Sequence, residues 1–129
     1  MSNNSLASIP KELSTQEQLQ HLNFNSNELK RLPGEIFSLI LKFFDASSNK
    51  LAKLPDMLGS CTSMVEMHLS RNGLIELPES FGGLSNLEIL DLKENSLTSL
   101  PKQFSLLEKL KKLDLSCNQL MTVPESIGF

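Results

Sequence analysis

The chain of 129 residues contains no tryptophan and no tyrosine, and it has only two cysteines. Tryptophan and tyrosine are among the commonest anchors of protein interfaces, so the sequence lacks the usual markers of a binding surface. Two cysteines are too few for a disulfide scaffold, which fits a reducing compartment and predicts a cytoplasmic location. No apolar run approaches the roughly 20 residues of a membrane-spanning helix, so we predict no membrane insertion.

Charge is modest in both signs, with 12 lysines and arginines, 15 aspartates and glutamates, and a net charge of -3. This balance lacks the basic excess of a dedicated nucleic-acid binder, so we expect no nucleic-acid partner. Hydrophobic residues make up 40% and charged residues 21% of the chain, which is typical of a folded domain. Residues 1–5 form neither the basic nor the apolar region of a secretory signal, so we expect none in this chain.

Leucine is abundant, with 26 in the chain, and it is periodic. The six prolines keep spacings of 23, 22, 23, 23 and 23 residues: Pro10, Pro33, Pro55, Pro78, Pro101 and Pro124. Six asparagines show the same spacings: Asn4, Asn27, Asn49, Asn72, Asn95 and Asn118. A period of roughly 20 to 29 residues with leucines at fixed offsets is the signature of a leucine-rich repeat solenoid.

Each repeat combines a short strand with a turn. In residues 87–101, Leu90 and Leu92 alternate with other residues, so the leucines face one side while Ile89 and Asp91 face the other. The asparagine that follows ends the strand, because its side chain can bond backbone groups where the chain turns away. Stacked asparagines would form a second ladder inside the coil. The proline then opens a short helical or 3-10 turn as its first residue.

The predicted fold is an α/β leucine-rich repeat solenoid of about five coils, with a parallel concave ladder, forming a single domain over residues 1–129. The core is closed from the convex side by five hydrophobic residues: Ile36, Leu58, Phe81, Phe104 and Ile127. One residue is missing between Leu39 and Leu41, where we expect a local kink. The chain begins and ends within a repeat, so we expect a piece or truncated form of a longer array, with incomplete caps.

The pattern LxxLxxLxLxxNxLxxLPxxI resembles the intracellular 23-residue leucine-rich repeats of Ras-suppressor and Shoc-type scaffold proteins. The resemblance covers essentially the whole chain. It implies a non-catalytic signalling scaffold that binds another protein on its concave face, with a small GTPase or a phosphatase subunit as the family's examples of partners. Two alternatives stay open: a regulatory or targeting segment of a larger enzyme, such as a ligase or phosphatase complex, and part of an immune-type receptor. We expect no cofactor, and the oligomeric state is left open.

The expected binding surface consists of strand side chains that point away from the core. The predicted partner-binding residues are His21, Asn23, Asn25, Phe43, Asp45, Val65, Glu66, His68, Arg71, Ile89, Asp91, Lys93, Lys112 and Asp114. Phe43, Val65 and Ile89 are apolar positions in a polar field and are candidate anchors; the alternative for Phe43 is packing beside its neighbour Phe44. With four or five residues per strand the face covers on the order of 350–400 Å², less than the roughly 800 Å² per partner of a standard interface.

One predicted column of the strand face places a histidine between carboxylates, and it reads Asn23, Asp45, His68, Asp91 and Asp114. Such a set could hold a metal ion or act as an acid and base. Catalysis, however, needs a pocket that excludes water, and an open sheet does not supply one. We therefore interpret the column as solvated surface and expect neither a metal nor an enzymatic activity. Cys61 occupies a leucine position and is expected to be buried.

Overall fold

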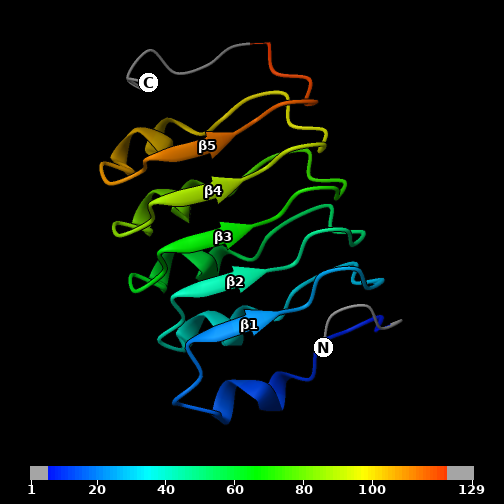
Figure 1. The fold of residues 1–129 in the computed structure, drawn as a ribbon, viewed down its shortest axis with the longest axis vertical. Helices are drawn as coiled ribbons and strands as arrows, with labels where there is room; N and C mark the ends of the chain where they lie inside the picture. The colour runs from blue at the N-terminus through cyan, green and yellow to red at the C-terminus, as the bar shows by residue number, and fades with distance from the viewer. Residues whose placement is uncertain (1–5, 122–129) are drawn as a thin grey trace.

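The computed structural model describes residues 6–121 and consists of five successive pairs of a 3-10 helix and a strand (Figure 1). The helices are η1 (Lys11–Thr15), η2 (Gly34–Ser38), η3 (Asp56–Ser60), η4 (Glu79–Gly83) and η5 (Lys102–Leu106). The strands are β1 (His21–Asn23), β2 (Phe43–Asp45), β3 (Glu66–His68), β4 (Ile89–Asp91) and β5 (Lys112–Asp114). None of the helices in residues 6–121 is long and apolar enough to span a bilayer.

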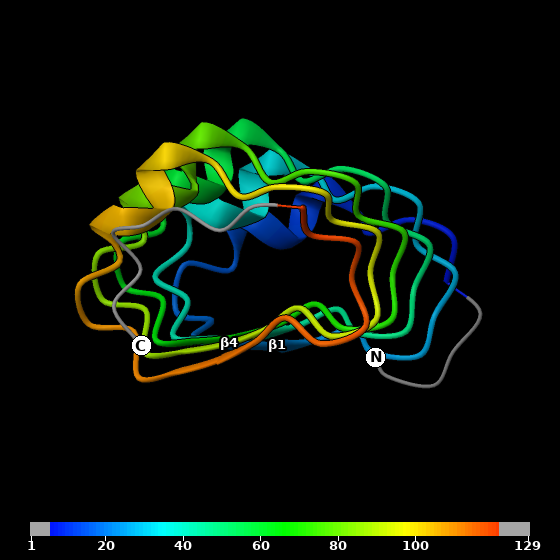
Figure 2. The ribbon, with the colours of Figure 1, turned by 90° about the horizontal axis from the view of Figure 1, so that it is seen from above.

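The strands form one parallel sheet in the order β1-β2-β3-β4-β5, so each coil pairs with the next one in sequence. Figure 2 shows the strands on one side of the coils and the 3-10 helices on the opposite side. This arrangement confirms the predicted solenoid fold. The strands are shorter than predicted, with three residues each instead of four or five.

The core lies between the sheet and the 3-10 helices. The middle residue of each strand points inward, and four of the five are buried: Leu22, Phe44, Met67 and Leu90. The convex-side residues predicted to close the core are also buried where they are described: Ile36, Leu58, Phe81 and Phe104. Ile127 lies outside the described residues. The 3-10 helices stack closely: there is no room for a side chain at Gly59, where an added Cβ would overlap the carbonyl oxygen of Ser80 in the next coil.

Each described proline before Met121 precedes its 3-10 helix rather than forming its first residue, which corrects the prediction. At Pro55 the backbone is extended, with φ -72° and ψ 149°, and η3 begins at Asp56. The carbonyl of Pro55 accepts the N–H of Leu58 at 3.1 Å and so closes the first turn. Proline suits this position because its fixed φ fits extended backbone, and the turn uses its carbonyl rather than the N–H it lacks.

The asparagine that follows each strand forms the predicted second ladder inside the solenoid. The Nδ2 group of Asn49 donates to the carbonyl of Ala46 in its own coil at 2.9 Å and to that of Phe24 in the preceding coil at 3.0 Å. Its Oδ1 accepts the N–H of Leu29, also in the preceding coil, at 2.9 Å. Asn72, Asn95 and Asn118 repeat this set of bonds, which satisfies backbone groups that the short strands leave free.

The residue just before each of these asparagines has a positive φ between 55° and 59°: Ser26, Ser48, Arg71, Glu94 and Cys117. This left-handed conformation turns the chain sharply, three residues after the last residue of each strand. None of the five is a glycine, so the surrounding bonds hold each residue in a conformation that side chains disfavour.

The repeat that is one residue short differs from the others in the connection from η2 to β2. Leu39, which follows η2, has ψ 163°, whereas the equivalent Cys61 after η3 has ψ 67°. The chain therefore runs directly into extended backbone where the other coils make a turn. The strand register is unchanged, since Phe43 pairs with His21 on one side and Glu66 on the other.

Candidate functional site

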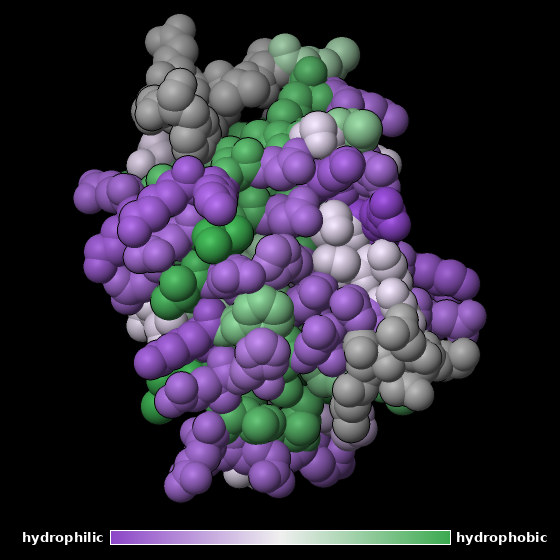
Figure 3. All heavy atoms as spheres, in the orientation of Figure 1, coloured by the Kyte–Doolittle hydropathy of each residue, from purple (hydrophilic) through white to green (hydrophobic). Residues whose placement is uncertain are grey.

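The strand register arranges the outward side chains in two columns across the sheet. The first column contains the first residue of each strand: His21, Phe43, Glu66, Ile89 and Lys112. The second column contains the third residue of each strand: Asn23, Asp45, His68, Asp91 and Asp114. The predicted histidine-containing column is therefore present, and His21 lies in the other column as expected. Figure 3 shows this side of the molecule as largely hydrophilic, with hydrophobic side chains between.

The second column also has a structural role, which was not predicted from the sequence. The Oδ1 atom of Asp45 accepts the backbone N–H of Ser47, two residues further on, at 2.8 Å. Asn23, Asp91 and Asp114 accept the equivalent N–H at 3.0, 3.0 and 2.9 Å. Each side chain thus closes a local turn at the end of its strand.

Two members of the second column depart from the others. The backbone and side chain of Ser116 donate hydrogen bonds to Asp114, and these bonds lower the pKa of that carboxyl below its ordinary value. His68 has no carboxylate or amide oxygen with which to close the turn. Its ring instead contacts neighbouring side chains. His68 is therefore the one second-column residue whose side chain does not accept the backbone N–H two residues further on.

The first column carries an aromatic cluster on the open face. The rings of His21 and Phe43 stack with centroids 4.1 Å apart and an interplanar angle of 9°. Phe43 also lies 5.6 Å from the ring of His68, at 45°. Phe44 points inward and meets Phe37 edge-on at 5.4 Å. Phe43 therefore packs on His21 rather than on Phe44, because adjacent strand residues point to opposite faces.

His68 is surrounded by carboxylates. Its Nε2 lies 2.7 Å from Oε2 of Glu66, and its Nδ1 lies 3.8 Å from Oδ2 of Asp91. Within residues 6–121, no lysine or arginine forms an ion pair with Glu66, Asp91 or Asp45. In the same part of the chain no three histidine, cysteine, aspartate or glutamate side chains are placed to hold a metal ion. The arrangement is an acidic, aromatic surface.

Two lysine or arginine side chains beside the strands form ion pairs within the chain. Arg71 and Glu94 form an ion pair of 2.8 Å, and Lys111 and Glu88 form one of 3.7 Å. All four side chains are more than a third exposed, so each pair contributes little to stability. The two pairs join residues just outside β3, β4 and β5, whereas Asp45, Glu66 and Asp91 within the strands have no lysine or arginine partner in residues 6–121.

The remaining predicted residues lie on or beside this face but are not all brought together. Val65 is half-buried and precedes β3, and its carbonyl accepts the N–H groups of Glu88 and Ile89. Asn25 follows β1, and its Oδ1 is buried with no hydrogen-bond partner among the described residues. Lys93 lies close enough to Asp114 to lower the pKa of its carboxyl further. The predicted residues therefore span the whole face, while the aromatic cluster occupies only β1 to β3.

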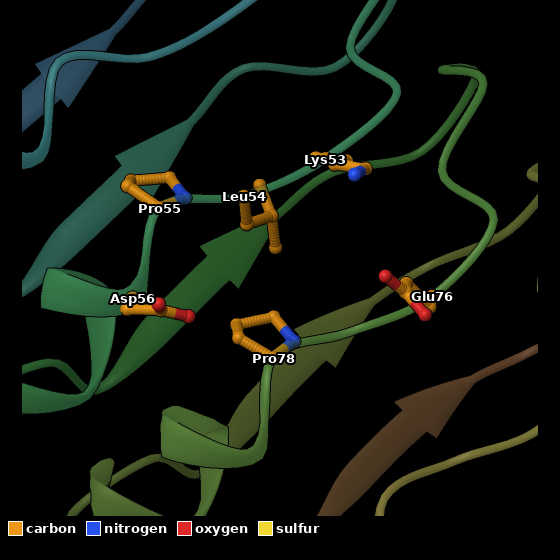
Figure 4. Close-up of a pocket in the computed structure, with 6 residues that line it drawn as sticks. All are labelled: Lys53, Leu54, Pro55, Asp56, Glu76 and Pro78. Atoms are coloured by element: carbon orange, nitrogen blue, oxygen red, sulfur yellow. The ribbon is translucent and has the colours of Figure 1, made fainter.

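A separate hollow of about 330 Å³ lies away from the strand face, between the loops that lead into η3 and η4 (Figure 4). Its lining residues are Lys53, Leu54, Pro55, Asp56, Glu76 and Pro78. This hollow was not predicted from the sequence, although the regularly spaced prolines that line it, Pro55 and Pro78, were a signal. Its lining mixes one lysine with two carboxylates on adjacent loops, and it contains no nucleophile paired with a base.

The parallel ladder, the stacked asparagines and the 3-10 turns define a leucine-rich repeat solenoid. Leucine-rich repeat models match residues 62–120 and 18–39, together more than half of the chain. The chain therefore belongs to the leucine-rich repeat family. Among the curated proteins, the mouse (Mus musculus) leucine-rich repeat and calponin homology domain-containing protein 1 is 36% identical over 67 residues, 52% of this chain.

Two solved structures share the fold over most of the chain. A TDR receptor structure is 36% identical and covers 93% of this chain with a TM-score of 0.85. The ectodomain of the plant membrane receptor kinase GASSHO1/SCHENGEN3 from Arabidopsis thaliana, in complex with Casparian strip integrity factor 2, is 33% identical and covers 88% with a TM-score of 0.79. The chain spans 9% of the mouse protein and 22% and 14% of the two receptor chains.

Proposed function

We propose that this chain is a non-catalytic module that binds a protein partner through its strand face, as an intracellular signalling scaffold in the cytoplasm. The observation that carries this proposal is the first column: its five side chains point outward, and the strand-end turns use only the second column. Such positions can vary without altering the fold. The Arabidopsis ectodomain, a neighbour with the same architecture, is described in complex with another molecule.

The size of the face sets the expected strength of binding. Five strands of three residues give a regular surface on the order of 240 Å², below the estimate made from longer strands. A standard interface takes roughly 800 Å² per partner. Stable binding therefore requires the loops after the strands, or coils beyond this chain, in addition to the two columns. By resemblance to Ras-suppressor and Shoc-type scaffolds, a small GTPase or a phosphatase subunit is the proposed class of partner.

The proposal is tested by paired affinity capture from cell lysate, read by mass spectrometry. The baits are the wild-type chain and a Phe43→Ala/Ile89→Ala variant, which removes two apolar side chains from the first column. The matched control is Met57→Ala/Leu106→Ala, which removes two exposed apolar side chains from η3 and η5, opposite the sheet. Circular dichroism verifies that every bait is folded.

We expect a captured protein that is lost with the first-column variant and retained with the control. Equal capture by both folded variants would move the binding site to the loops or to the helical side. Loss with the control alone would reverse the assignment of the face. Fractionation of the cells that express the chain tests the proposed cytoplasmic location separately.

A second candidate is supported by the receptor ectodomains among the solved neighbours. In that case the chain is a piece of a receptor-type array and binds its ligand outside the cell. The two candidates differ in compartment, so surface biotinylation of intact cells distinguishes them. Labelling of the chain in intact cells would support the receptor, and labelling only after lysis would support the scaffold.

A further inference from the structure

The outward positions of β2 and β3 form a square of four side chains. Phe43 and Glu66 are register partners in the first column, and Asp45 and His68 are register partners in the second. The sides of the square measure about 4.8 Å between strands and about 7 Å along them. An aromatic ring, two carboxylates and a histidine therefore share one small patch, called here the β2–β3 square.

The square is short of positive charge. Arg71, which follows β3, is paired with Glu94, and Lys111, which precedes β5, is paired with Glu88. β2 and β3 contain neither lysine nor arginine, and the exposed Lys42 just before β2 forms no ion pair within residues 6–121. Asp45 uses Oδ1 for the N–H of Ser47, and Glu66 uses Oε2 for His68. The second oxygen of each carboxylate makes no hydrogen bond or ion pair within the part of the chain that the structure describes. The square therefore complements a cation with several donors.

We propose that the protein partner places an arginine side chain on the β2–β3 square, with the guanidinium against Phe43 and its N–H groups donating to Glu66 and Asp45. This inference rests on the proposed protein-binding function and specifies the chemistry of the partner. Arginine fits better than lysine because a planar guanidinium packs on an aromatic ring and donates to carboxylates at the same time. A lysine ammonium supplies charge without the flat contact.

The existing contacts prepare the ring for this role. Stacking on His21 fixes the orientation of Phe43 on the side of β1, so little side-chain freedom is lost when a ligand arrives. Phe43 is half-buried, with the His68 ring 5.6 Å away and Glu66 as its register partner in β3. His68 holds Glu66 by a single oxygen, which leaves the carboxylate in position to receive a donor.

The inference is tested by nuclear magnetic resonance titration of the whole isotope-labelled chain with the blocked tripeptide acetyl-Ala-Arg-Ala-amide. Matched peptides carry lysine or citrulline in place of arginine; citrulline keeps the shape of the side chain and removes its charge. We expect shifts at the amides of His21, Phe43, Glu66 and His68, with arginine binding at least about fivefold more tightly than citrulline, and more tightly than lysine.

Variants assign the binding to the square. Glu66→Gln and Phe43→Leu should each weaken arginine binding about fivefold, whereas Glu88→Gln, a face carboxylate already paired with Lys111, should not. The spectrum of each variant reports its fold directly. Equal binding of arginine and citrulline, or shifts confined to other strands, would overturn the inference. If capture of a partner still depends on Phe43 and Ile89 while the arginine peptide fails, only the arginine inference falls.

Discussion

The two outward columns of the sheet look equivalent in sequence but differ in what their side chains do. In the second column, four of five side chains accept a backbone N–H two residues further on and so close the turn after the strand. In the first column no side chain has this task, and the residues range from phenylalanine to glutamate to lysine. Exposure on the strand face is therefore not the same as freedom to vary.

His68 shows the difference within one column. It occupies a position where the other coils have an aspartate or asparagine, and it contacts Glu66 and Phe43 instead of its own backbone. The departure from the structural pattern lies beside the aromatic cluster of the first column. A break in the structural pattern thus coincides with the surface that we assign to partner binding.

The largest expected effect comes from removing the inner ladder on which both columns depend. Asn49→Ala deletes side-chain bonds to Phe24, Ala46 and Leu29 and leaves buried backbone groups without partners. We expect the free energy of unfolding to fall by about 3 kcal/mol. Urea denaturation followed by circular dichroism measures it, with the exposed Lys50→Ala as control. A loss as small as the control's would show that water replaces the ladder.

A smaller effect is expected from the second column. Asp45→Ala removes the acceptor of the Ser47 N–H and should cost about 1 kcal/mol in the free energy of unfolding. Asp45→Asn keeps an acceptor oxygen, as Asn23 does in β1, and should be nearly neutral. The same urea titrations compare the two variants. Equal losses would mean that charge, rather than the turn bond, is what Asp45 contributes.

A substitution at His68 can restore the turn-closing acceptor that the second column lacks there. His68→Asn restores the acceptor without adding charge between Asp45 and Asp91, so we expect a gain of about 0.5 kcal/mol in unfolding free energy. His21→Asn, in the first column, should give no gain because no turn there awaits an acceptor. Unfolding titrations of the two variants decide the point. A gain from both, or from neither, would remove the distinction between the columns.

The last prediction compares the reactivity of a cysteine inside a coil, Cys61, with that of a cysteine on the surface, Cys117. Burial raises the pKa of the Cys61 thiol, which keeps it protonated and unreactive, whereas Cys117 is exposed. We expect iodoacetamide at pH 8 to modify Cys117 at least about tenfold faster, as mass spectrometry of the intact chain would show. In urea the two rates should converge. Rapid labelling of Cys61 in the folded chain would mean that this coil opens readily.

Much of the fold follows from the sequence because the same residue pattern recurs in every coil. The spacing of the repeats gives the register of the coils. From that register follow the period, the inward leucines, the asparagine ladder and the residues of the second column. The strand length was overestimated: β2 ends at Asp45, where the side chain accepts the N–H of Ser47 and closes a turn. The position of Pro55 was wrong by one residue because the 3-10 turn uses its carbonyl.

The candidate site was less predictable, since it depends on side-chain direction. Register alone placed Phe43 on the open face, but the stacking on His21 depends on rotamers that spacing does not determine. The turn-closing role of Asp45 had a signal, an Asp two residues before a Ser, but the solvated-surface interpretation left it unused. All the partner-binding assignments, those of Val65, Lys93 and Arg71 included, stay predictions.

The asparagine ladder also gives the solenoid a direction. Four amides donate back to a carbonyl of the preceding coil, as Asn72 does to Ala46, so a new coil completes bonds on one that already exists. A ribosome releases the coils in this same order, so the preceding coil is already available to bond each asparagine as it emerges. Folding during synthesis should therefore advance coil by coil from the N-terminus. Nascent chains stalled at successive lengths, probed by proteolysis, would show protection growing one repeat at a time.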